Sequence, residues 1–153
     1  MKPEDTIDFH IRWAWHGIAR MYNIEAAKYD TTMSVGQTLL NIDVEGTPST
    51  KLGPKMGMES RSLTRILKSM EEKGLIYKKA DAKDKRMVRI YLTDFGREKR
   101  EVSKEAVIKL NAAIHENIGK TNLQTFFKVI KKINLLLDSE AFSKNGTETK
   151  STK

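Results

Sequence analysis

Apolar residues in the first part of the chain recur at spacings of three and four, which is the period of an amphipathic helix. One such stripe spans residues 5–29 and predicts a single long helix. A second helix is predicted over residues 34–46, because Ser34 followed three positions later by Gln37 has the pattern of a capping box. Two helices of different length are therefore expected to open the chain.

A short helix, a turn and a longer helix are predicted next. Thr47-Pro48 has the pattern of an N-cap followed by a first-turn proline, and it predicts a helix over residues 47–56. Gly57 provides a turn, and the apolar spacing that follows predicts a helix from residue 59 to residue 73. Gly74 directly after it is a residue type that commonly ends helices.

The apolar pattern then changes to alternation over residues 75–80 and 87–92, which predicts two strands around a charged turn. Thr93 stands where an N-cap of a long fifth helix is expected, and Thr121 begins a capping-box pattern for a sixth. Residues 139–153 are rich in Ser, Thr and Lys without an apolar period, which predicts a disordered tail. We expect a mainly α fold with a small β-hairpin, in the order α-α-α-α-β-β-α-α.

The net charge of +8 is confined to one segment of this 153-residue chain. Of the 28 basic and 20 acidic residues, 15 and 7 lie between Thr47 and Arg100, so the remaining 13 basic and 13 acidic residues cancel. A folded basic segment between neutral flanks favours a polyanionic partner, and we expect nucleic acid rather than a membrane surface. No apolar run approaches the roughly 18 residues of a membrane span. With no cysteine for disulfides or thiolate metal sites, we expect a cytoplasmic protein.

The predicted short helix, glycine turn and longer helix form the pattern of a helix-turn-helix, whose second helix can enter the DNA major groove. The polar face of that second helix carries Ser60, Arg61, Ser62, Thr64, Arg65 and Lys68. The hairpin turn brings Lys83, Lys85 and Arg86 to a projecting tip that can reach the minor groove, and Asp84 suits the turn itself. Each element alone could be an ordinary solvated basic surface. Their succession in one unit favours binding to double-stranded DNA.

Several motifs of this central region resemble those of one family. They are residues 51–58, 63–67, 70–76, and 84–86 followed by 88–93. Together they resemble the MarR family of bacterial winged helix-turn-helix regulators, and they depart from its common pattern at Gly53-Pro54. The resemblance implies a winged helix-turn-helix DNA-binding region over residues 32–96. It also implies dimerisation helices over residues 1–31 and 97–138.

The same resemblance implies a homodimer that binds a pseudo-palindromic operator, usually as a repressor. Arg86 matches a residue that enters the minor groove, and Asp84 matches one that helps to hold the wing. Positions that usually touch phosphate are matched by Thr64 and Arg65. Positions that usually face bases are matched by Ser60, Arg61 and Ser62.

Many MarR-like regulators also bind a small aromatic or anionic effector in a crevice beside the dimerisation helices. The residues that could line such a crevice here are His10, Trp13, His16, Arg20 and Met33. Trp and Met at helical spacing are more often part of a core or a dimer interface, so both interpretations stay open. We expect no cofactor and no metal site.

Three other classes of function fit the sequence less well. An enzyme is disfavoured, because the histidines His10, His16 and His115 belong to no catalytic or metal-binding spacing, and no nucleotide-binding motif is present. A winged helix that only contacts proteins, without DNA binding, would have lost the basic face and the basic hairpin tip. RNA binding is compatible with the charge, but we expect no aromatic stacking platform on the hairpin.

Overall fold

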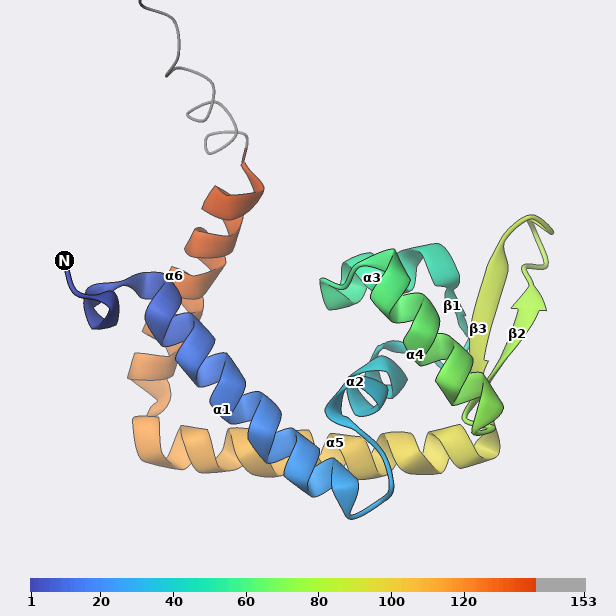
Figure 1. The fold of residues 1–153 in the computed structure, drawn as a ribbon, viewed down its shortest axis with the longest axis horizontal. Coiled ribbons are helices and arrows are strands. Elements are labelled where there is room, and N and C mark those ends of the chain that lie inside the picture. The colour runs from blue at the N-terminus through green and yellow to red at the C-terminus, as the bar shows by residue number, and fades with distance from the viewer. Residues whose placement is uncertain (140–153) are drawn as a thin grey trace, which may run out of the picture. The chain divides into compact units, whose positions relative to one another are not determined.

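The computed structural model describes residues 1–139, which fold into helices and one small antiparallel sheet (Figure 1). A 3-10 turn, η1 (Pro3–Asp5), precedes the first helix. The helices are α1 (Ile7–Ala27), α2 (Met33–Asn41), α3 (Ser49–Met56), α4 (Ser60–Glu72), α5 (Asp94–Ile118) and α6 (Lys120–Asp138). The strands are β1 (Thr47–Pro48), β2 (Ile76–Ala80) and β3 (Val88–Leu92). The predicted winged helix-turn-helix class is confirmed. Apart from Ser139, the predicted tail lies outside the described residues.

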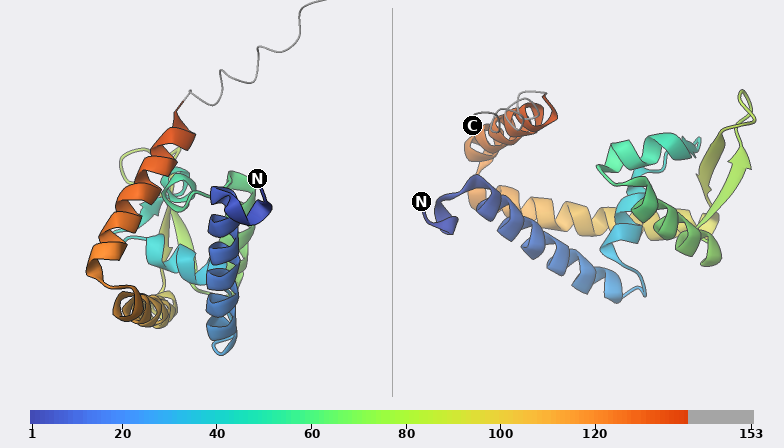
Figure 2. Two further views of the ribbon diagram at one scale, coloured as in Figure 1. Left: turned by 90° about the vertical axis from the view of Figure 1, so that its left-hand side faces the viewer. Right: turned by 45° about the horizontal axis from the view of Figure 1, so that its top comes forward.

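The chain divides into two compact units, residues 1–108 and a second unit that begins at Lys109. The first unit contains the whole sheet and the helices α1 to α4. In the right-hand view of Figure 2 the β2–β3 hairpin extends away from the neighbouring helices α3 and α4. The hairpin tip is therefore available for contact with a partner.

The sheet has three strands rather than the predicted two, in the order β1-β3-β2. The additional strand β1 pairs with β3, with Thr47 opposite Ile90 and Pro48 opposite Arg89. A proline can occupy this position because β1 is an edge strand, where one missing N–H interrupts no central ladder. The wing is thus tied along its β3 side to the segment that enters the helix-turn-helix.

The predicted helix starts are wrong in three places. Thr47 does not cap α3, which begins at Ser49, because the Thr47 backbone lies in β1 and its hydroxyl bonds Asp43 instead. The Ser34 capping box is not formed, since α2 begins at Met33 and its N-cap is Thr32, whose Oγ1 accepts from the Val35 N–H at 3.3 Å. Helix α6 begins at Lys120 after Gly119, so Thr121 is already inside the helix.

Two other predicted boundaries are confirmed. At the end of α4 the Leu75 N–H donates to the Met70 carbonyl at 2.9 Å and the Gly74 N–H to the Glu71 carbonyl at 3.0 Å, a Schellman motif with Gly74 at φ +69°. At the start of α5 the Thr93 Oγ1 accepts from an amide N–H one turn later. These two caps fix how α4 leads into β2 and how β3 leads into α5.

One buried cluster holds the central region together. Each of α2, α3, α4 and the sheet contributes apolar side chains to it: Val35, Leu39, Ile42, Leu52, Leu63, Leu67, Met70, Leu75, Ile76, Ile90 and Leu92. Burying each large apolar side chain stabilises the fold by about 1.5–3 kcal/mol. In α4 the buried residues are Leu63, Leu67 and Met70, as the spacing predicts. The opposite face of α4 is consequently directed to solvent.

Candidate nucleic-acid interface

The solvent face of α4 carries all six polar residues that the sequence singled out. Ser60, Arg61, Ser62, Thr64, Arg65 and Lys68 are all exposed. No ion pair within residues 1–139 involves Arg61, Arg65 or Lys68, so their charges are not neutralised by the described part of the chain. The Thr64 hydroxyl donates to the Ser60 carbonyl at 2.8 Å, which fixes its rotamer in the first turn of α4. This face can contact both phosphates and base edges.

The wing tip presents a second basic group. Lys83 and Lys85 are exposed, and the Arg86 side chain is 92% exposed while its Nε lies 3.3 Å from Asp84 Oδ1. Asp84 Oδ1 also accepts from the Arg86 N–H at 3.0 Å. Asp84 therefore organises the tip, consistent with the wing-holding role expected of it. An exposed ion pair of this kind contributes only about 0–1 kcal/mol, so Arg86 can leave it for a phosphate at little cost.

The base of the wing is held by a residue that sequence reasoning missed. Asp81 is buried, and its Oδ1 accepts from the Lys83 N–H at 2.8 Å and from the Asp84 N–H at 3.2 Å. Its Oδ2 accepts from Arg89 Nε at 2.9 Å. The two backbone hydrogen bonds and then Arg89 lower the pKa of Asp81 below its ordinary value. An Asp followed two and three residues later by turn residues is an Asx-turn signal that could have indicated this role.

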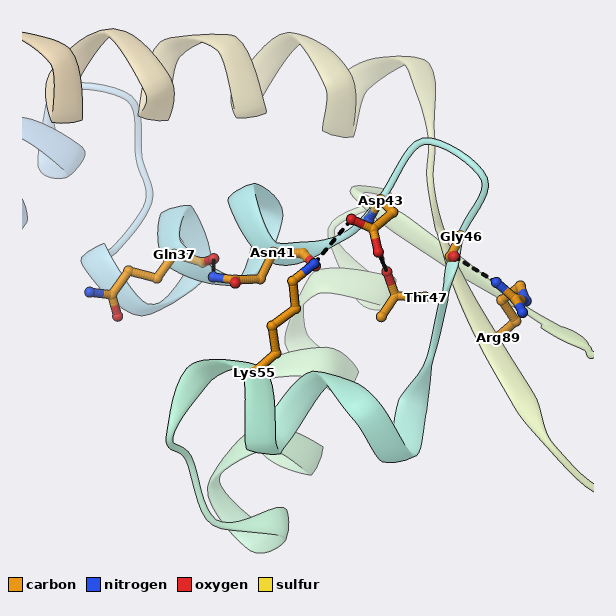
Figure 3. A network of polar contacts seen from close by, with 7 residues as sticks. All are labelled: Gln37, Asn41, Asp43, Gly46, Thr47, Lys55 and Arg89. Atoms are coloured by element: carbon orange, nitrogen blue, oxygen red, sulfur yellow. Dashed lines mark hydrogen bonds and ion pairs between the residues drawn. The ribbon is translucent and has the colours of Figure 1, made fainter. Parts of the chain in front are cut away.

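A polar network surrounds the loop between α2 and β1, as Figure 3 shows. Lys55 Nζ donates to the Asn41 carbonyl and to Asp43 Oδ1, both at 3.0 Å. The Thr47 hydroxyl donates to Asp43 Oδ2 at 3.1 Å. These bonds from Lys55 and Thr47 lower the pKa of Asp43. At the other end of the loop, Arg89 donates from Nη1 to the Gly46 carbonyl at 2.7 Å.

The hairpin does carry a stacked aromatic pair, so the expectation that it has no aromatic platform is wrong. Tyr77 and Tyr91 are opposite each other in register, with ring centroids 5.3 Å apart and ring planes 13° apart. Lys79 Nζ lies 5.4 Å from the Tyr77 ring centroid. Each ring covers a face of the other, which leaves less aromatic surface for a base than two separate rings would.

The structure does not assemble the five effector candidates into one pocket. His10 Nε2 bonds the Glu4 carbonyl at 2.8 Å, and Trp13 stacks on Phe9 with 73% of its surface exposed. His16 and Arg20 are exposed on α1, while the Met33 N–H donates to Asn23 Oδ1. A pocket of about 670 Å³ lies elsewhere, between α3 and α4, and none of these five residues lines it.

Two findings identify the family. The MarR family model matches residues 37–88. The HTH-type transcriptional regulator SarZ of Staphylococcus saprophyticus is 30% identical over 115 residues, which are 71% of this chain and 79% of SarZ. The chain belongs to the MarR family. A second member, the HTH-type transcriptional regulator TtmR of Methylorubrum extorquens, is 32% identical over 95 residues, 61% of this chain and 49% of TtmR. The chain thus matches only about half the length of that relative.

Solved structures support the same fold. The MepR–DNA complex of S. aureus superposes with a TM-score of 0.77 at 19% identity, covering 84% of this chain and 96% of MepR. At that identity the likeness concerns the MarR fold rather than individual contacts. No helix in residues 1–139 is long and apolar enough to cross a membrane.

Proposed function

We propose that this MarR-family chain is a sequence-specific regulator of transcription that binds double-stranded DNA as a homodimer. Helix α4 lies in the major groove, and the tip of the β2–β3 wing lies in the adjacent minor groove. The observation that carries the proposal is the exposure of two basic groups, on α4 and on the wing tip, within one unit of the fold. SarZ and TtmR are transcriptional regulators, and MepR was crystallised with DNA.

The two basic groups divide the work of recognition. Ser60, Arg61 and Ser62 stand at the N-terminal end of α4, the end from which a recognition helix reaches base edges. Thr64, Arg65 and Lys68 continue along the helix toward phosphates. Arg86 at the wing tip senses the width and the negative potential of the minor groove, with Lys83 and Lys85 beside it.

The dimer is proposed because α1 and α6 leave large apolar side chains uncovered. On α6, Phe126, Phe127 and Leu137 share one face with the buried Leu123, yet all three are exposed. On α1, Ile7 and Ile11 of the apolar stripe are exposed as well. A second copy of the chain, related by a twofold axis, would cover such surfaces and match a pseudo-palindromic operator. Repression follows if the operator overlaps a promoter.

Control by a small aromatic effector is a second candidate function. Its motivation is Trp13, whose ring is largely exposed on the face of α1 opposite the apolar stripe, together with His10, His16 and Arg20. Titration of aromatic acids against tryptophan fluorescence and operator affinity tests it. A change in both signals that Trp13→Phe reduces supports an effector site at α1. A change in neither signal contradicts it.

The DNA-binding proposal is tested by selecting bound sequences from random duplexes and measuring their affinity across a salt series. Arg61→Ala is expected to cost about 1–3 kcal/mol on the selected site and to relax the preference at one or two base pairs. Arg86→Ala is expected to weaken binding to every sequence and to lower the salt slope by about one phosphate equivalent per subunit. Arg12→Ala, which removes the same charge from α1, is the matched control.

Three outcomes would contradict the proposal. The first is a parent protein that enriches no duplex sequence. The second is equal losses for Arg12→Ala and Arg61→Ala, which would indicate attraction by net charge alone. The third is tight binding to a protein partner that survives loss of Arg61 and Arg86, as a winged helix without DNA binding would show.

A further inference from the structure

One polar side chain touches both the wing and the segment that leads into the helix-turn-helix. Arg89 lies in β3 with 27% of its side chain exposed. Its Nε donates to Asp81 Oδ2 at 2.9 Å, and its Nη1 donates to the Gly46 carbonyl at 2.7 Å. These two acceptors lie on opposite sides of β3, one after β2 and one just before β1. Only a planar guanidinium presents two donors in a fixed fork that can hold both.

On the wing side, the contacts continue to the tip. Asp81, which Arg89 holds, accepts from the backbone N–H groups of Lys83 and Asp84. Asp84 in turn accepts from the N–H and the Nε of Arg86. A continuous series of hydrogen bonds therefore runs from Arg89 to the residue that we place in the minor groove.

On the other side, Gly46 belongs to a loop that is itself fixed to the helix-turn-helix. Lys55 of α3 bonds the Asn41 carbonyl and Asp43, and Asp43 bonds Thr47 directly after Gly46 (Figure 3). The Gly46 N–H donates to the Asp43 carbonyl at 3.0 Å, which ties Gly46 to the same loop. Gly46 has φ +81°, and a Cβ there would lie 2.5 Å from the Tyr91 ring, so only glycine fits at this position. The loop thus gives Arg89 a rigid anchor.

We propose that Arg89 is a positioning residue for DNA recognition, which sets the wing relative to α4 while making no DNA contact itself. The inference rests on the proposed DNA-binding function. Its consequence is energetic coupling: Arg86 contributes its full share to affinity only while Arg89 holds the base of the wing. Arg61 reaches DNA from α4, which does not depend on that contact.

The register of the sheet supplies a matched control. Lys79 is directly opposite Arg89 in the β2–β3 pair and carries the same charge. Its ammonium lies over the Tyr77 ring and has no ion pair with any residue in 1–139. Lys79→Met and Arg89→Met therefore remove one positive charge at the same level of the wing. Arg89→Met alone also breaks the bonds to Asp81 and Gly46.

The test is a set of double-mutant cycles on operator affinity, with Arg86→Ala and Arg61→Ala each made in the parent, Arg89→Met and Lys79→Met backgrounds. If Arg86→Ala weakens the parent about tenfold, we expect it to weaken Arg89→Met less than about threefold, because the wing is already misplaced. In the Lys79→Met background the full loss is expected. Losses from Arg61→Ala are expected to be equal in all three backgrounds.

The salt dependence separates positioning from direct contact. The comparison is made with all three basic tip residues already replaced (Lys83→Ala, Lys85→Ala and Arg86→Ala), so that moving the wing removes no further contact. Adding Arg89→Met to that variant is expected to leave its salt slope unchanged. A further decrease of about one phosphate equivalent per subunit would mean that Arg89 binds DNA and would overturn the proposal. Equal losses from Arg86→Ala in the parent and Arg89→Met backgrounds would overturn it as well.

A variant that retains the charge guards against a loss of folding. Arg89→Lys retains the charge and most of the stem, but its point-like ammonium cannot bond both acceptors as the fork does. If Arg89→Met is not folded at the assay temperature, the cycle is run with Arg89→Lys instead. Arg86→Ala is then expected to reduce operator affinity less in the Arg89→Lys background than in the parent. An equal reduction in both backgrounds overturns the proposal. If the parent protein binds no duplex DNA, the proposed function is wrong. If the parent binds DNA but the affinity losses of Arg86→Ala and Arg89→Met simply add, only this inference is wrong.

Discussion

The winged region and the terminal helices use their apolar residues in opposite ways. In the winged region α2, α3, α4 and the sheet direct their large apolar side chains into one cluster, and Leu52, Met70 and Ile90 retain no exposed surface. Along α1 and α6 the apolar side chains remain at the surface, with Ile7 and Leu137 each 64% exposed. The first arrangement is complete within one chain. The second leaves large apolar side chains uncovered by residues 1–139.

The polar residues of the two regions also differ in burial and in the number of their partners. In the winged region, buried or half-buried polar groups have defined partners: Arg89 bonds Asp81 and the Gly46 carbonyl, and Thr47 bonds Asp43. On α1, Arg12 meets Asp8 only in a loose exposed pair at 3.9 Å. The polar bonds of the winged region hold a fixed geometry, which DNA recognition needs. The terminal helices carry the apolar surface that the proposed dimer would cover.

The largest effect is expected from truncating a side chain in the closed cluster. Ile90→Ala should lower the free energy of unfolding by about 2–5 kcal/mol, because Ile90 has no exposed surface and its loss leaves a cavity. Ile7→Ala removes the same atoms from α1 and serves as the counterpart. Urea unfolding at two protein concentrations measures both.

The dependence of these losses on protein concentration distinguishes a fold within one chain from an association between chains. We expect the Ile90→Ala loss at both concentrations, whereas a loss for Ile7→Ala should appear as weaker association. If Ile7→Ala costs as much as Ile90→Ala at every concentration, α1 is packed within its own chain and the contrast between the two regions is wrong.

The general architecture could be predicted from the sequence because it depends on local patterns. The face of α4 that carries Arg61 and Arg65 follows from helical spacing, and the end of that helix follows from Gly74 and its neighbours. The wing tip follows from alternation around a charged turn. Each of these signals lies within one element or one turn.

Three of the missed features depend on contacts between residues that are distant in the sequence. Arg89 and Gly46 are 43 residues apart, and nothing in either local pattern indicates their bond. Strand β1 was missed because its Thr47-Pro48 also fits a helix start, and only pairing with β3 decides between the two. The stacking of Tyr77 on Tyr91 likewise follows from the strand register. The alternation of apolar and polar residues does not by itself reveal that register.

A charge placed on the uncovered face of α6 should have the next largest effect. The parent should sediment with a mass about twice 17.5 kDa. Leu137→Asp is expected to shift it toward the monomer mass, because the carboxylate would be buried without a partner at an apolar interface. Lys128→Asp places the same group on the opposite face of α6, where we expect the dimer to persist. A dimer that Leu137→Asp leaves intact would show that this face is not the interface.

The smallest effect is expected in the pH dependence of the free energy of unfolding. It distinguishes the two regions because Asp81 of the winged region titrates with a lowered pKa. The pKa of Asp81 is lowered by the Lys83 and Asp84 amides and by Arg89, so its ionised form stabilises the fold. That contribution is present above the unfolded-state pKa, near the ordinary 3.8, and is lost as the pH falls through the lower folded-state value. Asp81→Asn should therefore be less stable at neutral pH and should lose less stability on acidification.

Urea unfolding between about pH 3 and pH 7 compares the two proteins, and the stability difference should narrow toward the acid end because only the parent has this proton to bind. Asp8→Asn removes a carboxylate from the exposed surface of α1 and controls for the change in net charge. We expect Asp8→Asn to lose as much stability as the parent when the pH is lowered. The apolar surfaces of α1 and α6 do not titrate, so sedimentation over the same range should report an unchanged mass while the wing loosens. A stability difference that stays constant with pH would show that Asp81 acts through its shape and hydrogen bonds rather than through its charge.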